Sequence, residues 1–186
     1  MSHKEFENSS ENNITSDFEF IIPSPDRWPE YKAMRLQALK EEPQAFAVPY
    51  KEELDAPDQK WIDRLKPSND PADIRLVVES QNQMIGMVSS FRHKEKVDTA
   101  VIVNVYISNK YRGKGLGKKM IQELVGRLRE VENVKKIELS VNVKQSAAIH
   151  TYESLGFQIT GTENVVMGDG KSYDEYLMDK ITKRSE

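Results

Sequence analysis

A strand, a glycine-rich basic loop and an amphipathic helix follow one another without interruption in residues 101–128. The strand reads Val-Ile-Val-Asn-Val-Tyr-Ile over residues 101–107. The helix that follows carries its apolar residues on one face, namely Leu116, Met120, Ile121, Leu124, Val125 and Leu128. This order places the N-terminus of the helix just beyond the end of the strand. The first amides of a helix have no internal partner and carry partial positive charge. The segment therefore predicts an anion site at one edge of a sheet.

The loop itself combines glycine with positive charge. Gly113, Gly115 and Gly117 allow the backbone to approach a ligand closely and to adopt positive φ angles. Residues 110–119 contain no acidic side chain, although the 186-residue chain has a net charge of −3. The five cations in this stretch are Lys110, Arg112, Lys114, Lys118 and Lys119. Because the charge is concentrated locally, we interpret the loop as a phosphate site.

Two common phosphate-binding fingerprints do not fit this loop. A nucleotide P-loop needs a glycine five positions before its Gly-Lys-Ser/Thr, but Arg112 stands five before Gly117 and Lys119 replaces the hydroxyl residue. A dinucleotide fingerprint needs a third glycine where this chain has lysine or methionine. The pattern that does fit is Arg112-x-x-Gly115-x-Gly117. Taken alone, this pattern is also compatible with a solvated glycine turn before a surface helix.

A second strand and helix are predicted in residues 136–157. Residues 136–142 alternate between apolar and polar, as a half-buried strand does. Residues 145–157 predict a helix with Ala148, Ile149, Tyr152 and Leu155 on one face. Gly156 suits the left-handed conformation that ends many helices.

Together the two segments resemble the cofactor-binding core of the GNAT superfamily, the acetyl-CoA-dependent N-acyltransferases. Residues 112–117 resemble the family's pyrophosphate-binding loop, and the Leu-Gly-Phe at 155–157 closes a helix like its second cofactor-binding segment. In that segment of the family a tyrosine, here Tyr152, lies beside the thioester sulfur. One position departs from the pattern, because Gln145 stands where the family usually has asparagine. The fold that this resemblance implies is α/β (α+β), with a mixed, mostly antiparallel sheet of about seven strands, helices on both faces and two parallel strands splayed at the cofactor site.

The order of the predicted elements is similar to the GNAT order over residues 17–181. Strands are expected at residues 17–22, 74–79, 84–92, 97–108 and 136–142, with two more joined near residues 168–170; helices are expected at 26–42, 55–66, 116–128 and 145–157. Asp55 is the expected N-cap of the second helix. We expect residues 1–16 to form a flexible polar tail and residues 17–186 to form one domain.

The resemblance implies acetyl-CoA as cosubstrate, no metal, and direct attack by a primary amine in a ternary complex. Tyr152 is implied as the acid that protonates the departing sulfur; its alternative role is that of a packing residue. The implied cofactor-binding residues are Val105, Tyr106, Ile107, Arg112, Gly113, Lys114, Gly115, Leu116, Gly117, Lys118, Gln145, Ser146, Ala148 and Tyr152. The alternative function is a non-catalytic GNAT-fold module that binds CoA or acyl-CoA as a sensor or assembly component.

Neither the general base nor the acceptor is fixed by the sequence. Residues 100–107 contain no carboxylate, and His93 and Glu53 have no supporting spacing. A water chain and an amine that is already neutral on arrival are the alternatives. Residues 26–66 are the implied acceptor cleft, and they carry acids that either attract a cationic amine or pair with interleaved lysines. These acids are Glu41, Glu42, Glu52, Glu53, Asp55 and Asp58, and the aromatic residues of the segment, Trp28, Tyr31, Phe46, Tyr50 and Trp61, form either pocket walls or core. A small amine, an amino acid, an aminoglycoside and a protein amine all remain open as acceptors.

Composition excludes several other classes. The chain has no cysteine, so cysteine nucleophiles, disulfides and thiolate metal sites are absent, and its three histidines show no ligand spacing. No apolar run reaches the ~18 residues of a membrane span, and no signal peptide is recognisable. A pI of about 5.8 argues against general nucleic-acid binding. We expect a cytoplasmic protein with an amine substrate as its partner, and without nucleic-acid or membrane partners; a homodimer is left open.

Overall fold

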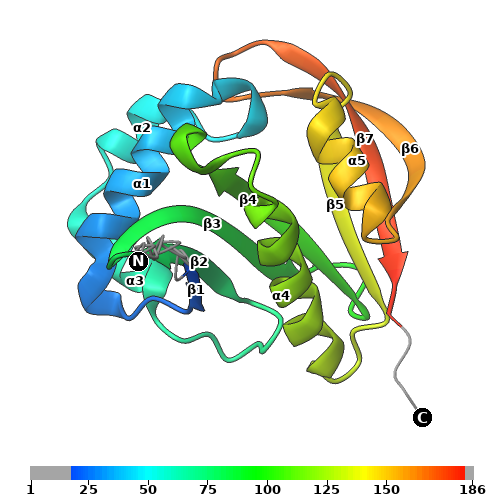
Figure 1. Ribbon diagram of the computed structural model, residues 1–186, viewed down its shortest axis with the longest axis horizontal. Helices are drawn as coiled ribbons and strands as arrows, with labels where there is room; N and C mark the ends of the chain where they lie inside the picture. The colour runs from blue at the N-terminus through cyan, green and yellow to red at the C-terminus, as the bar shows by residue number, and fades with distance from the viewer. Residues whose placement is uncertain (1–17, 183–186) are drawn as a thin grey trace, which may run out of the picture.

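The computed structural model describes residues 18–182 and contains one seven-stranded sheet (Figure 1). The predicted tail, residues 1–16, lies outside the described residues. The elements are β1 (Phe18–Ile21), η1 (Pro25–Arg27), α1 (Trp28–Glu41), η2 (Pro43–Ala45), α2 (Tyr50–Leu54), α3 (Asp58–Leu65), β2 (Arg75–Ser80), β3 (Gln83–Arg92), β4 (Thr99–Ile107), η3 (Asn109–Tyr111), α4 (Leu116–Glu130), β5 (Lys136–Asn142), α5 (Ser146–Ser154), β6 (Gln158–Val166) and β7 (Ser172–Ile181).

The strands lie in the order β1-β2-β3-β4-β5-β7-β6. Every neighbouring pair is antiparallel except β4 and β5, which run parallel. The last strand in the chain, β7, is inserted between β5 and β6, so β6 forms the edge. The predicted mixed, mostly antiparallel sheet of seven strands is thereby confirmed.

Helices cover both faces of this sheet, because successive strand residues point to opposite sides. On β2, Val77 packs with apolar residues of α1 and α3. Its neighbours Leu76 and Val78 pack in a second core with the buried face of α4 and with residues of α5. Two apolar cores therefore sandwich the sheet, as predicted.

The two parallel strands separate part-way along their length. Residues 99–102 of β4 pair with residues 136–139 of β5, and no pairing continues beyond them. Asn104 and Val105 form a β-bulge, since the register of β4 against β3 shifts by one residue between Val103 and Tyr106. Beyond this point β5 stays paired with β7 while β4 stays paired with β3, and the two strands diverge (Figure 1). The predicted divergence is confirmed.

The region between α1 and β2 differs from its prediction. Asp55 is not an N-cap: it caps the C-terminus of the short helix α2, and its amide donates to the Lys51 carbonyl at 3.0 Å. Helix α3 starts only at Asp58, after Pro57, because the extended conformation of a proline suits the position before a helix. The pattern of residues 50–65 thus contains two short helices rather than one. No helix within residues 18–182 is long and apolar enough to cross a bilayer.

Candidate active site

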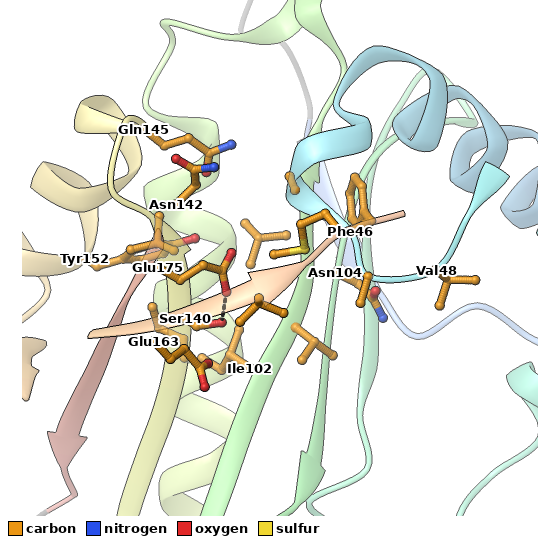
Figure 2. Close-up of a pocket in the computed structure, with 18 of the residues that line it drawn as sticks. Phe46, Val48, Ile102, Asn104, Ser140, Asn142, Gln145, Tyr152, Glu163 and Glu175 are labelled. Atoms are coloured by element: carbon orange, nitrogen blue, oxygen red, sulfur yellow. Dashed lines mark hydrogen bonds between the residues drawn. The ribbon is translucent and has the colours of Figure 1, made fainter. Parts of the chain in front are cut away.

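A cavity of about 360 Å³ occupies the region where β4 and β5 separate (Figure 2). Its floor is formed by residues 102–105 of β4 and 139–142 of β5. One wall is the segment 45–48, between α1 and α2, and the opposite wall comes from β6 and β7. Because segments far apart in the chain meet here, the cavity is the place where groups remote in sequence can act on one ligand.

The bulge in β4 shapes the floor. Asn104 has a φ of +58°, a left-handed conformation that asparagine tolerates better than most residues. Asn104 and Val105 line the cavity. Their backbone groups have no β5 partner, so this stretch of main chain is available to a ligand. Val105, which the sequence predicted as a cofactor-binding residue, therefore lies in the cavity. Its contact with a cofactor stays a prediction.

The next two residues of β4 do not present their side chains to the cavity. The Tyr106 hydroxyl donates a 2.7 Å hydrogen bond to Glu41 Oε2, and burial together with this carboxylate raises the pKa of Tyr106. Ile107 is 8 % exposed and packs in the core beside α4. Any role of these two residues at the cofactor is therefore restricted to their backbone.

The glycine loop leaves space in front of the α4 N-terminus. Gly113 and Gly115 have φ angles of +75° and +71°, which glycine adopts without strain, and a Cβ atom at either position would have no non-neighbouring atom within 4 Å. Gly115 is the N-cap of α4, and no side chain caps this end of the helix. Gly117 has no positive φ, so its conformation does not require glycine. An anion can therefore approach the first amides of α4, beginning at Leu116, without steric hindrance.

The cationic side chains of the loop differ in what they contact. Arg112 Nε donates to the Ile107 carbonyl at 2.8 Å, and its Nη1 binds Glu42 Oε1 at 2.6 Å. The side chain of Arg112 thus ties the loop to β4 and to the end of α1 instead of extending toward Gly115. The ammonium groups of Lys110 and Lys114 lie 5.3 and 5.7 Å from the ring centroid of Tyr111, and Lys118 is exposed. These three lysines are exposed positive charges of the loop.

Tyr152 reaches the cavity from α5. Its side chain is 5 % exposed and packs edge-on against Phe157, with ring centroids 6.1 Å apart. No hydrogen bond joins its hydroxyl to another residue of the described chain, and burial raises the pKa of Tyr152. The phenol therefore stays protonated at neutral pH and has a proton to donate.

Two side-chain amides line the cavity near the start of α5. Gln145 lines the cavity, and its carbonyl accepts the amide of Ala148 at 3.0 Å. Asn142 lies beside Gln145 (Figure 2), is 4 % exposed, and was not predicted as a site residue. Ser146 lies on the first turn, where its carbonyl is 2.8 Å from His150 Nδ1. The structure thus places two side-chain amides where sequence reasoning considered only one.

Sequence reasoning also missed two carboxylates, Glu163 and Glu175. They stand directly opposite each other on β6 and β7 and both line the cavity. Glu175 is 6 % exposed, and its Oε2 accepts a 2.7 Å hydrogen bond from the Ser140 hydroxyl (Figure 2). Burial raises the pKa of Glu175; the Ser140 hydrogen bond opposes this shift, and the charge of Glu163 adds to it. No local sequence signal distinguishes Glu175 from the other acids of β7, since its burial depends on pairing with β5.

Comparison with known proteins identifies the family. Residues 33–157 match the model of the acetyltransferase (GNAT) family. The chain belongs to this family. A spermine/spermidine N(1)-acetyltransferase of Bacillus subtilis is 35 % identical over 78 residues, which are 42 % of this chain and 51 % of the relative. An L-2,4-diaminobutyric acid acetyltransferase of Virgibacillus pantothenticus is 38 % identical over 66 residues, which are 36 % of this chain and 41 % of the relative. The first of these matches thus covers about half the length of the relative.

Solved structures show the same fold. A GNAT-family acetyltransferase from Streptococcus pneumoniae superposes with a TM-score of 0.76 at 20 % identity, over 90 % of this chain and 100 % of that chain. A putative acetyltransferase from Salmonella typhimurium with its cofactor acetyl-CoA superposes with a TM-score of 0.74 at 17 % identity, over 90 % of this chain and 95 % of that chain. At these identities the likeness concerns the fold.

In this GNAT chain the acids of residues 26–66 do not line the cavity. They contact other residues instead: Glu41 binds Tyr106 and Gln37, Glu42 binds Arg112, Glu53 binds Arg64, Glu52 lies 3.8 Å from Lys60, and Asp58 lies 3.3 Å from Lys32. Of the aromatic residues, Phe46 lines the cavity, whereas Tyr31 and Trp61 are core residues. The segment contributes to the cavity through residues 45–48 and through Arg35 of α1, and not through its acids.

The two candidates considered for the general base are placed elsewhere. Glu53 is 1 % exposed and accepts two hydrogen bonds from Arg64, at 2.8 and 3.0 Å. His93 follows β3 near the opposite end of β4, where its Nδ1 accepts the amides of Glu95 and Lys96 at 3.1 Å. Neither side chain lines the cavity. Among residues 18–182, no group of three or more His, Cys, Asp or Glu side chains is arranged to hold a metal ion.

Proposed function

We propose that this GNAT chain transfers an acetyl group from acetyl-CoA to a primary amine, by direct attack of the amine in a ternary complex. The observation that carries the proposal is the cavity at the divergence of β4 and β5, which brings a protonated phenol, Tyr152, and a buried carboxylate, Glu175, to one site. Acyl transfer to an amine needs both an acid for the leaving group and a base for the nucleophile.

The cofactor-binding half fits a long anionic cosubstrate. Open space in front of Gly113 and Gly115, together with the uncapped N-terminus of α4, suits the pyrophosphate. Lys114 and Lys118 supply the neighbouring positive charge. The backbone of residues 103–105, which has no partner on β5, offers donors and acceptors for the extended pantetheine arm and for the acetyl oxygen. Acetyl-CoA supplies an acetyl group activated as a thioester.

The proton transfers follow from the two titratable groups. An alkylamine with a pKa of about 10 arrives as an ammonium ion and must lose a proton before it attacks. Glu175 accepts this proton, and its raised pKa makes it a better base near neutral pH than an ordinary glutamate. The C–N bond then forms and the C–S bond breaks, while Tyr152 donates its proton to the departing sulfur. The second proton released by the nitrogen restores the phenol.

A second candidate function is a non-catalytic module that binds CoA or an acyl-CoA. Gln145, which replaces the asparagine usual in the family, is the observation that favours it. The longer side chain changes the reach of the amide toward the pantetheine arm. Asn142, buried beside it, offers a second amide for the same purpose. A cytoplasmic location stays a prediction from the sequence, and a homodimer stays open.

Release of free thiol from acetyl-CoA, measured against a panel of amines, tests the proposed function. Continuous release with at least one amine, accompanied by formation of the acetylated product, is the expected result. A parallel calorimetric titration with CoA separates the alternatives. Tight CoA binding without turnover on any amine would establish the non-catalytic module, and absence of CoA binding by folded protein would refute both functions.

A further inference from the structure

The cavity contains a buried cation that the acetyl-transfer chemistry does not use. Arg35, on α1, lines the cavity and is only 5 % exposed. Its guanidinium carbon lies 4.5 Å from the ring centroid of Phe46, a residue of the same wall. Its Nη1 is buried and has no hydrogen-bond partner among residues 18–182. A guanidinium stays charged at neutral pH, so this group is a buried positive charge with an unused donor.

The surrounding residues do not provide Arg35 with an anion of its own. Glu53 acts on it electrostatically, but Arg64 holds both oxygens of that carboxylate, and Lys60 lies 4.0 Å from one of them. Burial lowers the pKa of Arg35, which reflects its loss of water. Charged groups inside proteins are normally paired, because their desolvation is otherwise uncompensated. The unused donor of Arg35 therefore calls for an anionic group on a ligand.

The opposite wall of the cavity has the opposite charge. Glu163 and Glu175 project from β6 and β7, on the side of the cavity away from Phe46 and Val48 (Figure 2). The guanidinium of Arg35 lies against the Phe46 ring. Two carboxylates placed directly across a strand pair repel each other, and a positive charge between them relieves this repulsion. The cavity is therefore polarised, with a cation on one side and two acids on the other.

We propose that the cavity selects acceptors that carry a free carboxylate as well as an amine, that is, free amino acids. Arg35 binds the carboxylate, and Glu163 with Glu175 receives the ammonium group. The assignment rests on the proposed function, since it names the acceptor of that reaction. Polyamines carry no carboxylate and place positive charge against Arg35, so they fit this cavity poorly. Amides of amino acids keep the shape of the acceptor but lose the charge that Arg35 recognises.

Two sets of matched acceptors test the selection. One set is L-phenylalanine, its carboxamide and phenethylamine; the other is L-2,4-diaminobutyrate, its carboxamide and 1,3-diaminopropane, with spermidine added. Thiol release gives kcat/KM for each compound with wild type and with Arg35→Met. In at least one set, we expect wild type to prefer the acid over both analogues by about tenfold or more, the effect of one charged hydrogen bond. Arg35→Met is expected to abolish the preference by raising KM for the acid.

The choice of variant keeps the test informative. Methionine is unbranched and apolar, and a buried charge without an ion-pair partner is costly to desolvate, so we expect Arg35→Met to fold. Arg127→Met serves as the matched control, because Arg127 lies on α4, pairs with Glu123 at 2.9 Å and is outside the cavity. The control is expected to retain the preference for the acid. Equal use of acids, amides and polyamines by wild type would overturn the assignment, as would an unchanged preference in Arg35→Met.

A binding measurement separates this inference from the reaction. In the presence of CoA, the thermal shift produced by each acid is compared with that produced by its carboxamide, for wild type and both variants. A shift specific to the acid and lost only in Arg35→Met supports the assignment even if no thiol is released, in which case the proposed reaction alone fails. Equal shifts for acid and carboxamide, or no shift and no turnover with any acid, would overturn the assignment.

Discussion

The two halves of the candidate site are built in different ways, and the glycine loop of the cofactor half is not among the residues that line the cavity. The half assigned to the cofactor comes from one continuous stretch, β4 through α5, and depends on backbone features: a bulge at Asn104, positive φ at Gly113 and Gly115, and an uncapped helix. The acceptor half is assembled from α1, the segment 45–48, β6 and β7. It depends on side-chain charge, since Arg35 and two glutamates are among the residues that line it.

This difference separates the expected effects of mutation. Backbone features recognise groups common to every CoA molecule, so a change there should abolish cofactor binding whatever the acceptor. Side-chain charges distinguish one amine from another, so a change there should alter acceptor kinetics and leave CoA binding unchanged. Each variant below tests whether the two halves are independent.

Gly115→Glu is expected to have the largest effect. The substitution places a side chain and a negative charge in the open space in front of α4, where the phosphates are proposed to bind. CoA binding should fall below detection in calorimetric titration, although the fold survives because the loop is at the surface. Gly126→Glu is the control, since Gly126 is exposed on the same helix, also with no atom within 4 Å. Normal CoA binding by folded Gly115→Glu would remove the loop from the site.

Tyr152→Phe tests the point where the two halves meet. Loss of the proton donor should lower kcat by about 10²–10⁴. KM for acetyl-CoA should change much less, because the phosphates and the pantetheine arm provide most of the binding. Tyr173→Phe, which removes a hydroxyl that bonds Asp169 outside the cavity, is the control. A decrease of less than threefold in well-folded protein would show that Tyr152 is a packing residue.

Glu175→Gln tests the acceptor half. The amide cannot accept the ammonium proton, so kcat/KM for the amine should fall about 10²-fold near neutral pH. The deficit should shrink as the pH rises toward the pKa of the amine, since more of the acceptor is then neutral. Affinity for CoA should equal that of wild type. If CoA affinity falls in parallel with activity, the two halves are not independent.

Glu175→Gln is also expected to have a smaller, pH-dependent effect on the thermal stability of the protein. Because burial and Glu163 raise the folded-state pKa of Glu175, the folded protein binds more protons than the unfolded chain between the ordinary pKa and the raised one. The contribution of Glu175 to stability is therefore lost as the pH rises through that window. Glu175→Gln should melt at a higher temperature than wild type at neutral pH, and the difference should narrow toward pH 4. A constant difference across this range would contradict the raised pKa.

Much of the cofactor half was predictable because its determinants are local. The strand at 101–107, the glycine loop and the helix that follows are adjacent in sequence, and a period of two or of 3.6 residues identifies each element. The separation of the two parallel strands agreed with the expectation. Arg112 differs from the expectation in one respect. Its position in the sequence identifies the loop, but its side chain binds Glu42, which belongs to a distant segment that the local pattern does not include.

Asp55 shows the limit of local patterns. As a possible capping residue it predicted a helix start, yet the same residue ends α2, and Pro57 sets the start of α3. An aspartate suits the local backbone at the start of a helix as well as after its end. The packing of Trp61 and Leu65 against α1 and the sheet favours the observed helix, which starts at Asp58.

By itself, the sequence determined the order of the strands, the glycine-rich loop before α4 and the place of Tyr152 on its helix, because propensity and periodicity act over a few residues. Only the tertiary structure decided which charges are buried. Glu175 becomes a candidate base because β7 inserts between β5 and β6, and Arg35 becomes a buried cation because α1 packs beneath Phe46. Burial and the pKa shifts that it causes depend on contacts between residues far apart in the chain, which no local pattern records.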